Sequence, residues 1–139
     1  MTLKRRSVSG KKGLVMVWKG VIIEESLEDA SLLDSVSLVG YAESFLEEEE
    51  GKGVMRFHHF ELTDEKKEWF VREAERCLKH GWYIHIGKDD ILVVIFKERS
   101  FKFSSSEKEK LEEARKYGIS VGVIREQMPF EELLKDPFY

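Results

Sequence analysis

The segment Ile91-Leu-Val-Val-Ile-Phe96 is the longest run of apolar residues in the chain, and it decides the predicted fold. A strand made only of apolar residues has no polar side to turn towards water. We therefore expect it to be covered on both sides, in the interior of a sheet. The run is far shorter than the roughly 20 residues that a membrane-spanning helix needs. It predicts a central strand of a packed domain.

The segment before this run predicts a second strand. Trp82, Ile84 and Ile86 alternate with Tyr83 and His85. Because successive side chains of a strand point to opposite faces, the first three residues share one face and the other two share the opposite face.

A helix is predicted before this strand, over residues 63–80. Phe70, Ala74, Cys77 and Leu78 recur at helical spacing and form one apolar stripe. Gly81 supplies the residue type that commonly ends a helix. We expect the stripe to pack on the sheet.

The remaining pattern predicts an α+β chain with an arm and one domain. We expect a disordered basic arm over residues 1–13 and a single α+β domain over residues 14–139. The order of elements favours a ferredoxin-like split β-α-β sandwich: an antiparallel-rich sheet with helices on one face and a C-terminal βαβ-type extension. Further strands are expected at 15–24, 36–47, 54–62, 101–103 and 119–124, a hairpin tip at 47–53, and helices at 26–33, 106–117 and after Pro129. For the helix at 106–117 we expect a capping box of Ser106 with Glu109 at the start and Gly118 as the end.

Composition indicates a protein of a reducing compartment and of a thermophilic organism. Cys77 is the single cysteine, so it forms no internal disulfide, and we expect a cytoplasmic protein without a membrane segment. The chain has no asparagine and one glutamine against 21 Glu and 15 Lys. Few heat-labile amides and many ionic side chains are typical of thermophile proteins.

The first residues raise the question of nucleic-acid binding. Lys4, Arg5, Arg6, Lys11 and Lys12 could contact phosphates, beside bases stacked on sheet aromatics. Against this, the sequence pI is about 5.7 and residues 20–50 hold ten acidic residues and no basic one. RNA binding through the sheet face and the basic arm remains an alternative. The aromatic residues considered for that face are Tyr41, Phe45, Phe57 and Tyr83.

Several segments resemble an uncharacterised family of short prokaryotic proteins. They are the opening Gly20-Val-Ile-Ile-Glu-Glu-Ser-Leu27, the pair Trp82-Tyr83, the segments Val94-Ile-Phe-Lys97 and Phe101-Lys-Phe103, and Lys116-Tyr-Gly-Ile-Ser120 before Gly122. The resemblance covers residues 20–128 in pieces. It implies a histidine at the position of His58 and an aspartate where this chain has His85. It supports a compact domain and implies no activity.

Candidate reactive residues are few. His58, Tyr83 and Glu25 are the candidate catalytic set, and Glu24 and His85 are candidate ligand-binding residues. His58 and His59 are adjacent on a predicted strand, so they point to opposite faces and cannot chelate one metal together. We predict no metal site and no cofactor.

These observations favour a non-catalytic binding or regulatory module whose partner is a small ligand or a protein. Homodimerisation through an apolar interface is left open by the many aromatic residues. A small enzyme with His58, Tyr83 and Glu25 in one pocket is the alternative from another class.

Overall fold

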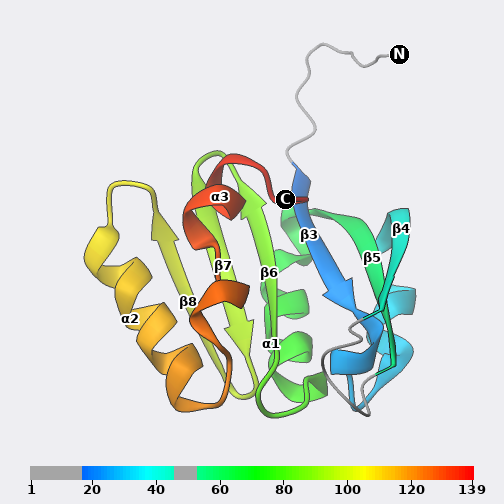
Figure 1. Cartoon of the computed structure of the whole chain (residues 1–139). Coiled ribbons are helices and arrows are strands. Elements are labelled where there is room, and N and C mark those ends of the chain that lie inside the picture. Colours follow the sequence, from blue (N-terminus) through cyan, green and yellow to red (C-terminus); the bar gives the residue numbers. More distant parts are fainter. Residues whose placement is uncertain (1–16, 46–52) are drawn as a thin grey trace.

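The computed structural model describes residues 17–45 and 53–139 (Figure 1). The predicted arm at 1–13 and most of the predicted hairpin tip at 47–53 lie outside these ranges. The described chain is an α+β structure on one six-stranded sheet. Its strands are β3 (Val17–Ile23), β4 (Ser37–Phe45), β5 (Val54–Thr63), β6 (Tyr83–Lys88), β7 (Ile91–Phe96) and β8 (Arg99–Ser104), and its α-helices are α1 (Lys67–Cys77), α2 (Lys108–Ser120) and α3 (Phe130–Lys135).

The strands lie in the order β4-β5-β3-β6-β7-β8, and each neighbouring pair is antiparallel. Every residue of β7 after Ile91 is buried, so the prediction of a strand covered on both sides is confirmed. β5 and β6 flank β3 and are joined through α1, which makes one split β-α-β unit. β3 and β4 likewise flank β5, but the chain between them forms short 3₁₀ segments and no α-helix. The ferredoxin-like arrangement as a whole is not confirmed.

Helices cover both faces of the sheet, and the expectation of helices on one face is wrong. Figure 1 shows α1 behind the sheet, with α2 and α3 in front of it. Val93 and Ile95 of β7 pack in the core on the α1 side, whereas Leu92 and Val94 pack in the core beneath α2 and α3. A strand that is apolar on both faces needs cover on both faces to remove its side chains from water.

The predicted apolar stripe of α1 is confirmed. Phe70, Ala74, Cys77 and Leu78 are all buried in the core behind the sheet. The short helix expected at 26–33 is instead two 3₁₀ segments, η1 (Glu24–Ser26) and η2 (Ala30–Ser35). Asp29 caps the second, because its carboxylate accepts from the Ser31 backbone amide at 3.0 Å.

The expected C-terminal βαβ-type extension is also wrong, because residues 119–124 form no strand. Gly118 does not end α2; it lies inside the helix, where an added Cβ would come within 2.4 Å of Met128 Sδ. The chain turns at Gly122 instead, with a φ of +103°, a conformation that favours glycine. The following segment, η4 (Arg125–Gln127), leads into α3.

No helix within residues 17–45 and 53–139 has both the length and the apolar character needed to cross a bilayer.

Candidate functional site

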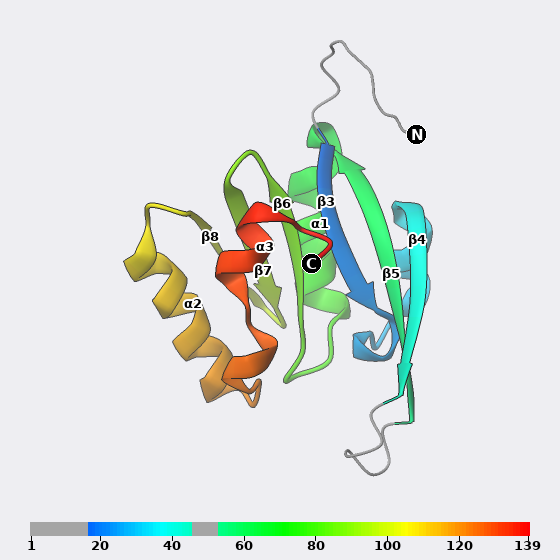
Figure 2. The ribbon, with the colours of Figure 1, turned by 45° about the horizontal axis from the view of Figure 1, so that its top comes forward.

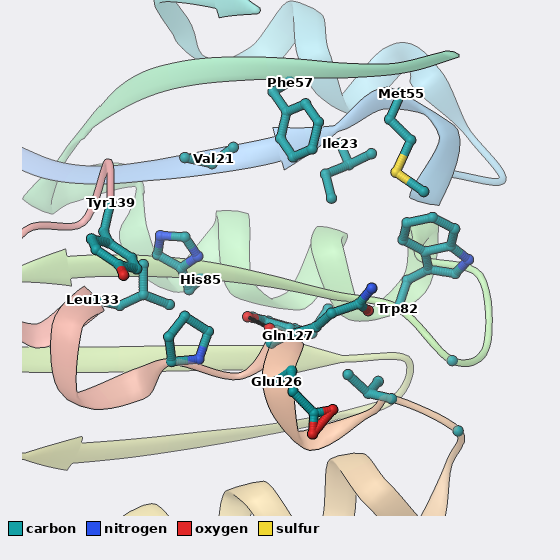
Figure 3. Close-up of a pocket in the computed structure, with 15 residues that line it drawn as sticks. Val21, Ile23, Met55, Phe57, Trp82, His85, Glu126, Gln127, Leu133 and Tyr139 are labelled. Atoms are coloured by element: carbon teal, nitrogen blue, oxygen red, sulfur yellow. Dashed lines mark hydrogen bonds between the residues drawn. The ribbon is translucent and has the colours of Figure 1, made fainter. Parts of the chain in front are cut away.

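A pocket lies where β3 and β6 diverge. β3 pairs with β5 along its whole length, but its pairing with β6 covers three residue pairs and ends at Val21 and His85. On the face opposite α1, a pocket of about 380 Å³ opens beside this point (Figure 3). That volume is within the range of small-molecule sites.

The pocket remains open because the second helical layer ends before β3. α3 is six residues long and packs over β6 and β7, and no described helix lies in front of β3, β5 and β4 (Figure 1). The side chains that face this side of β3 and β5 are therefore uncovered by any described helix. Most of the wall is apolar, with Val21 and Ile23 from β3, Met55 and Phe57 from β5, and Trp82 and Leu133 opposite them.

His85 is the buried polar group of the pocket wall. Its side chain is 7% exposed, and its Nε2 donates a hydrogen bond to the backbone oxygen of Pro137 at 2.6 Å. Burial lowers the pKa of His85 to about 4, although the hydrogen bond to Pro137 acts in the opposite direction; nearby His59 lowers it further. The imidazole is therefore neutral at pH 7.

Tyr83 lines the pocket, but its hydroxyl proton is already engaged in a hydrogen bond. Its hydroxyl donates to the backbone oxygen of Gln127 at 2.5 Å, and its ring packs on Phe96 and Phe130. Burial raises the pKa of Tyr83 well above its ordinary value. Tyr83 is therefore a fixed, neutral structural link between β6 and η4.

The C-terminal residues 136–139 cross from α3 to the open face of β3 (Figure 2). The Phe138 ring stacks on the His59 ring, with centroids 4.9 Å apart and planes 9° apart. Lys19 Nζ lies 5.8 Å from the centroid of the same ring. An added Cβ at Gly87 would come within 2.9 Å of Pro137 Cγ, so glycine permits this close passage. The segment closes one end of the pocket, which Tyr139 lines.

A separate polar cluster lies on the opposite face of the sheet, which α1 covers. His58 pairs with Ile22, whose side chain is in the core behind the sheet, so His58 points away from the pocket. Its Nε2 lies 2.9 Å from Glu24 Oε1, and its ring centroid lies 5.0 Å from that of Tyr41. The imidazole and the Glu24 carboxylate are therefore in hydrogen-bonding contact on β5, with the Tyr41 ring of β4 beside them.

Glu25 belongs to the same cluster. Its carboxylate accepts from the Arg56 backbone amide at 2.7 Å and from the Arg56 guanidinium at 2.5 Å. Partial burial raises the pKa of Glu25, but the hydrogen bonds and the charge of Arg56 lower it more, so that the net shift is downward. Glu25 ties η1 to β5 as an ionised carboxylate.

The structure does not bring the predicted catalytic set together. His58 and Glu25 lie on the α1 face, whereas Tyr83 lies in the pocket on the other face. Of the two candidate ligand-binding residues, His85 lines the pocket and Glu24 does not. An enzyme that uses His58, Tyr83 and Glu25 in one pocket is contradicted by these positions.

The structure describes only some of the residues predicted to bind RNA. Lys4, Arg5, Arg6, Lys11 and Lys12 lie outside the described residues. Tyr41 faces the same side of the sheet as His58, opposite to Phe57 and Tyr83. The aromatic residues considered for base stacking thus do not share one face.

Sequence reasoning missed most of the pocket wall. Val21, Ile22 and Ile23 make the second half of β3 apolar on both faces, as β7 is, whereas Lys19 places a charge on the pocket face of the first half. The pattern that predicts a covered strand at β7 therefore also occurs over the last three residues of β3. Whether the second face of such a strand is covered or forms an open pocket depends on where α3 lies. The sequence of β3 itself does not indicate that position.

In residues 17–45 and 53–139, no three His, Cys, Asp or Glu side chains come close enough together to hold an ion. Cys77 is buried, and burial raises the pKa of its thiol.

Compared with protein-family models, curated proteins and solved structures, the chain matches none.

Proposed function

We propose that the domain is a binding module for a small, largely apolar molecule, which occupies the pocket between β3, β5 and β6. The observation that carries the proposal is the pocket of about 380 Å³ on the part of the sheet that the described helices leave uncovered. Clefts of this size with apolar walls and few polar groups are the usual form of ligand sites.

The composition of the wall supports the apolar character of the ligand. Val21, Ile23 and Phe57 come from neighbouring strands and point into the same space (Figure 3). Uncovered, these side chains leave apolar surface in contact with water, and a ligand that covers them gains roughly 25 cal/mol for each Å² removed from water. A ligand thus completes the apolar layer that α3 leaves incomplete.

Titration with N-phenyl-1-naphthylamine, a neutral dye that becomes fluorescent in apolar surroundings, tests the proposal. We expect saturable fluorescence in the wild type and its loss in Val21→Phe, because the added ring fills the pocket. Val39→Phe is the matched control, since Val39 lies on β4, is half exposed and does not line the pocket. Equal dye binding by the wild type and Val21→Phe, or no binding by the wild type, would reject the proposal.

Three further expectations accompany this function: a cytoplasmic location, a thermophilic source and the option of a homodimer. Light scattering checks the last, since a dimer gives about twice the mass of 16.3 kDa. A monomer at high concentration would leave the pocket as a site complete within one chain.

A further inference from the structure

The two ring nitrogens of His85 have different surroundings. Nε2 contacts the Pro137 backbone oxygen, which can only accept a hydrogen bond, so Nε2 carries the proton. In a neutral imidazole the other nitrogen, Nδ1, then has a free lone pair and acts as an acceptor. The C-terminal segment thereby fixes the tautomer of His85.

Nδ1 receives no hydrogen bond from residues 17–45 or 53–139. Among residues 17–45 and 53–139, the one side-chain nitrogen or oxygen that is both fully buried and without a hydrogen-bond partner is Arg115 Nε. Nδ1 of His85, which also has no partner, therefore keeps some surface that is accessible from the pocket. Figure 3 shows the edge of the His85 ring turned into the pocket. A side chain more than nine-tenths buried thus presents an unpartnered acceptor to the cavity.

The charges around the pocket restrict the ligand further. Of the described residues that line it, none is Lys or Arg, and the one acidic side chain is that of exposed Glu126. An anionic ligand would have no cation in the wall to replace its hydration. The flat side chains of Phe57 and Trp82 suit an aromatic ring.

We infer that the pocket takes a planar aromatic molecule that carries an N–H or O–H donor and no anionic group, and that this donor binds Nδ1 of His85. The inference rests on the proposed function and names the ligand class of the same pocket. A buried acceptor that is left unpaired is costly, so the site discriminates against analogues without the donor.

Indole and 1-methylindole test the inference, because they differ in the N–H donor and are otherwise nearly the same shape. Binding of each probe is measured by NMR titration in the wild type, His85→Phe and His85→Asn. The readout is the indole/1-methylindole affinity ratio in the wild type divided by that in His85→Phe. One neutral hydrogen bond predicts a quotient of roughly three to ten.

His85→Asn is the rescue variant, because its side-chain oxygen lies near the position of Nδ1. We expect it to recover part of the preference for indole. A quotient near one in a wild type that binds both probes overturns the role of His85 and leaves the proposed function intact. Failure of the wild type to bind either probe rejects both.

Two measurements on the wild type protect the test against variants that do not fold. The ¹⁵N resonances of His85 are expected to show protonated Nε2 and unprotonated Nδ1, with Nδ1 shifting on addition of indole and not of 1-methylindole. The reverse tautomer overturns the inference. 1-Naphthol is expected to bind more tightly than 1-naphthoate, and tighter binding of the anion overturns the ligand class.

Discussion

The two halves of the sheet differ in how they are covered. Strands β6, β7 and β8 have helices on both faces, whereas the described part of β3, β5 and β4 has helical cover on the α1 side alone. Yet residues 21–23 of β3 are apolar on both faces, as β7 is along its whole length, and only Lys19 earlier in β3 places a charge on the pocket face. A similar local pattern therefore gives a core strand in one half and the wall of a pocket in the other.

The largest expected effect separates the two faces of a single strand. Phe60 and Phe57 both lie on β5, but Phe60 is fully buried behind the sheet and Phe57 lines the pocket. Phe60→Ala should lower the free energy of unfolding by about 3–5 kcal/mol, and Phe57→Ala by roughly 1–2 kcal/mol, because no packed core surrounds the second ring. Urea denaturation of both variants measures the difference. Equal losses would show that the pocket face is packed as tightly as the core.

The next effect concerns acid. Because the pKa of His85 is about 4 in the folded chain and 6.5 in the unfolded chain, the unfolded chain binds an additional proton between these values. The free energy of unfolding therefore rises as pH rises through this window. The contribution of His85 reaches its full value above pH 6.5. Acidification should remove up to about 3 kcal/mol through this one group.

Urea denaturation at several pH values between 4 and 7 measures this contribution. His85→Phe has no proton to take up, so its dependence on pH should be flatter than that of the wild type by the amount that His85 contributes. Ionisable groups that the two proteins share cancel in the comparison. Parallel curves would mean that His85 is not buried as a neutral group.

A smaller effect tests the junction at which β3 and β6 separate. An added Cβ at Gly20 would come within 2.2 Å of the His85 backbone oxygen, so Gly20→Ala must displace β3 from β6. We expect a loss of about 1–3 kcal/mol in the free energy of unfolding, together with weaker dye binding. Gly40→Ala on β4 is the control, since its nearest neighbour is the His59 side chain at 3.1 Å. Similar losses in both variants would contradict the close contact at this junction.

The smallest effect concerns the polar cluster on the α1 face. Glu25→Gln weakens the ion pair with Arg56, which is partly exposed and screened by salt, so the change in thermal stability should be slight. Dye affinity should be unchanged, because Glu25 lies on the face opposite the pocket. A clear loss of binding in this variant would mean that the two faces are coupled.

Local sequence patterns predicted those elements whose own apolar residues show that they are buried. The apolar run of β7 and the stripe of α1 were sufficient to place both in the core. Two Ser/Glu pairs with the same spacing at the start of α2 were harder to distinguish. A capping box of Ser106 with Glu109 was expected, but Glu107 accepts from the Ser104 backbone amide, two residues earlier with the same spacing.

The pocket could not be predicted in the same way. It depends on the point at which β3 and β6 cease to pair, and on the reach of a six-residue helix distant in sequence. Gly118 shows the same limit, since a glycine at the end of a helical pattern predicts a stop. Here it accommodates Met128, a contact that only the folded chain defines.

NMR of methyl-labelled protein during titration with indole shows directly whether a ligand occupies the pocket. Ile22 and Ile23 are adjacent on β3 and face opposite sides of the sheet, the first in the core and the second in the pocket. We expect intermolecular NOEs from indole to the methyl groups of Ile23 and Val21, and none to those of Ile22. NOEs to the exposed side chains of Leu38 and Val39 in their place, or none at all, would contradict this expectation.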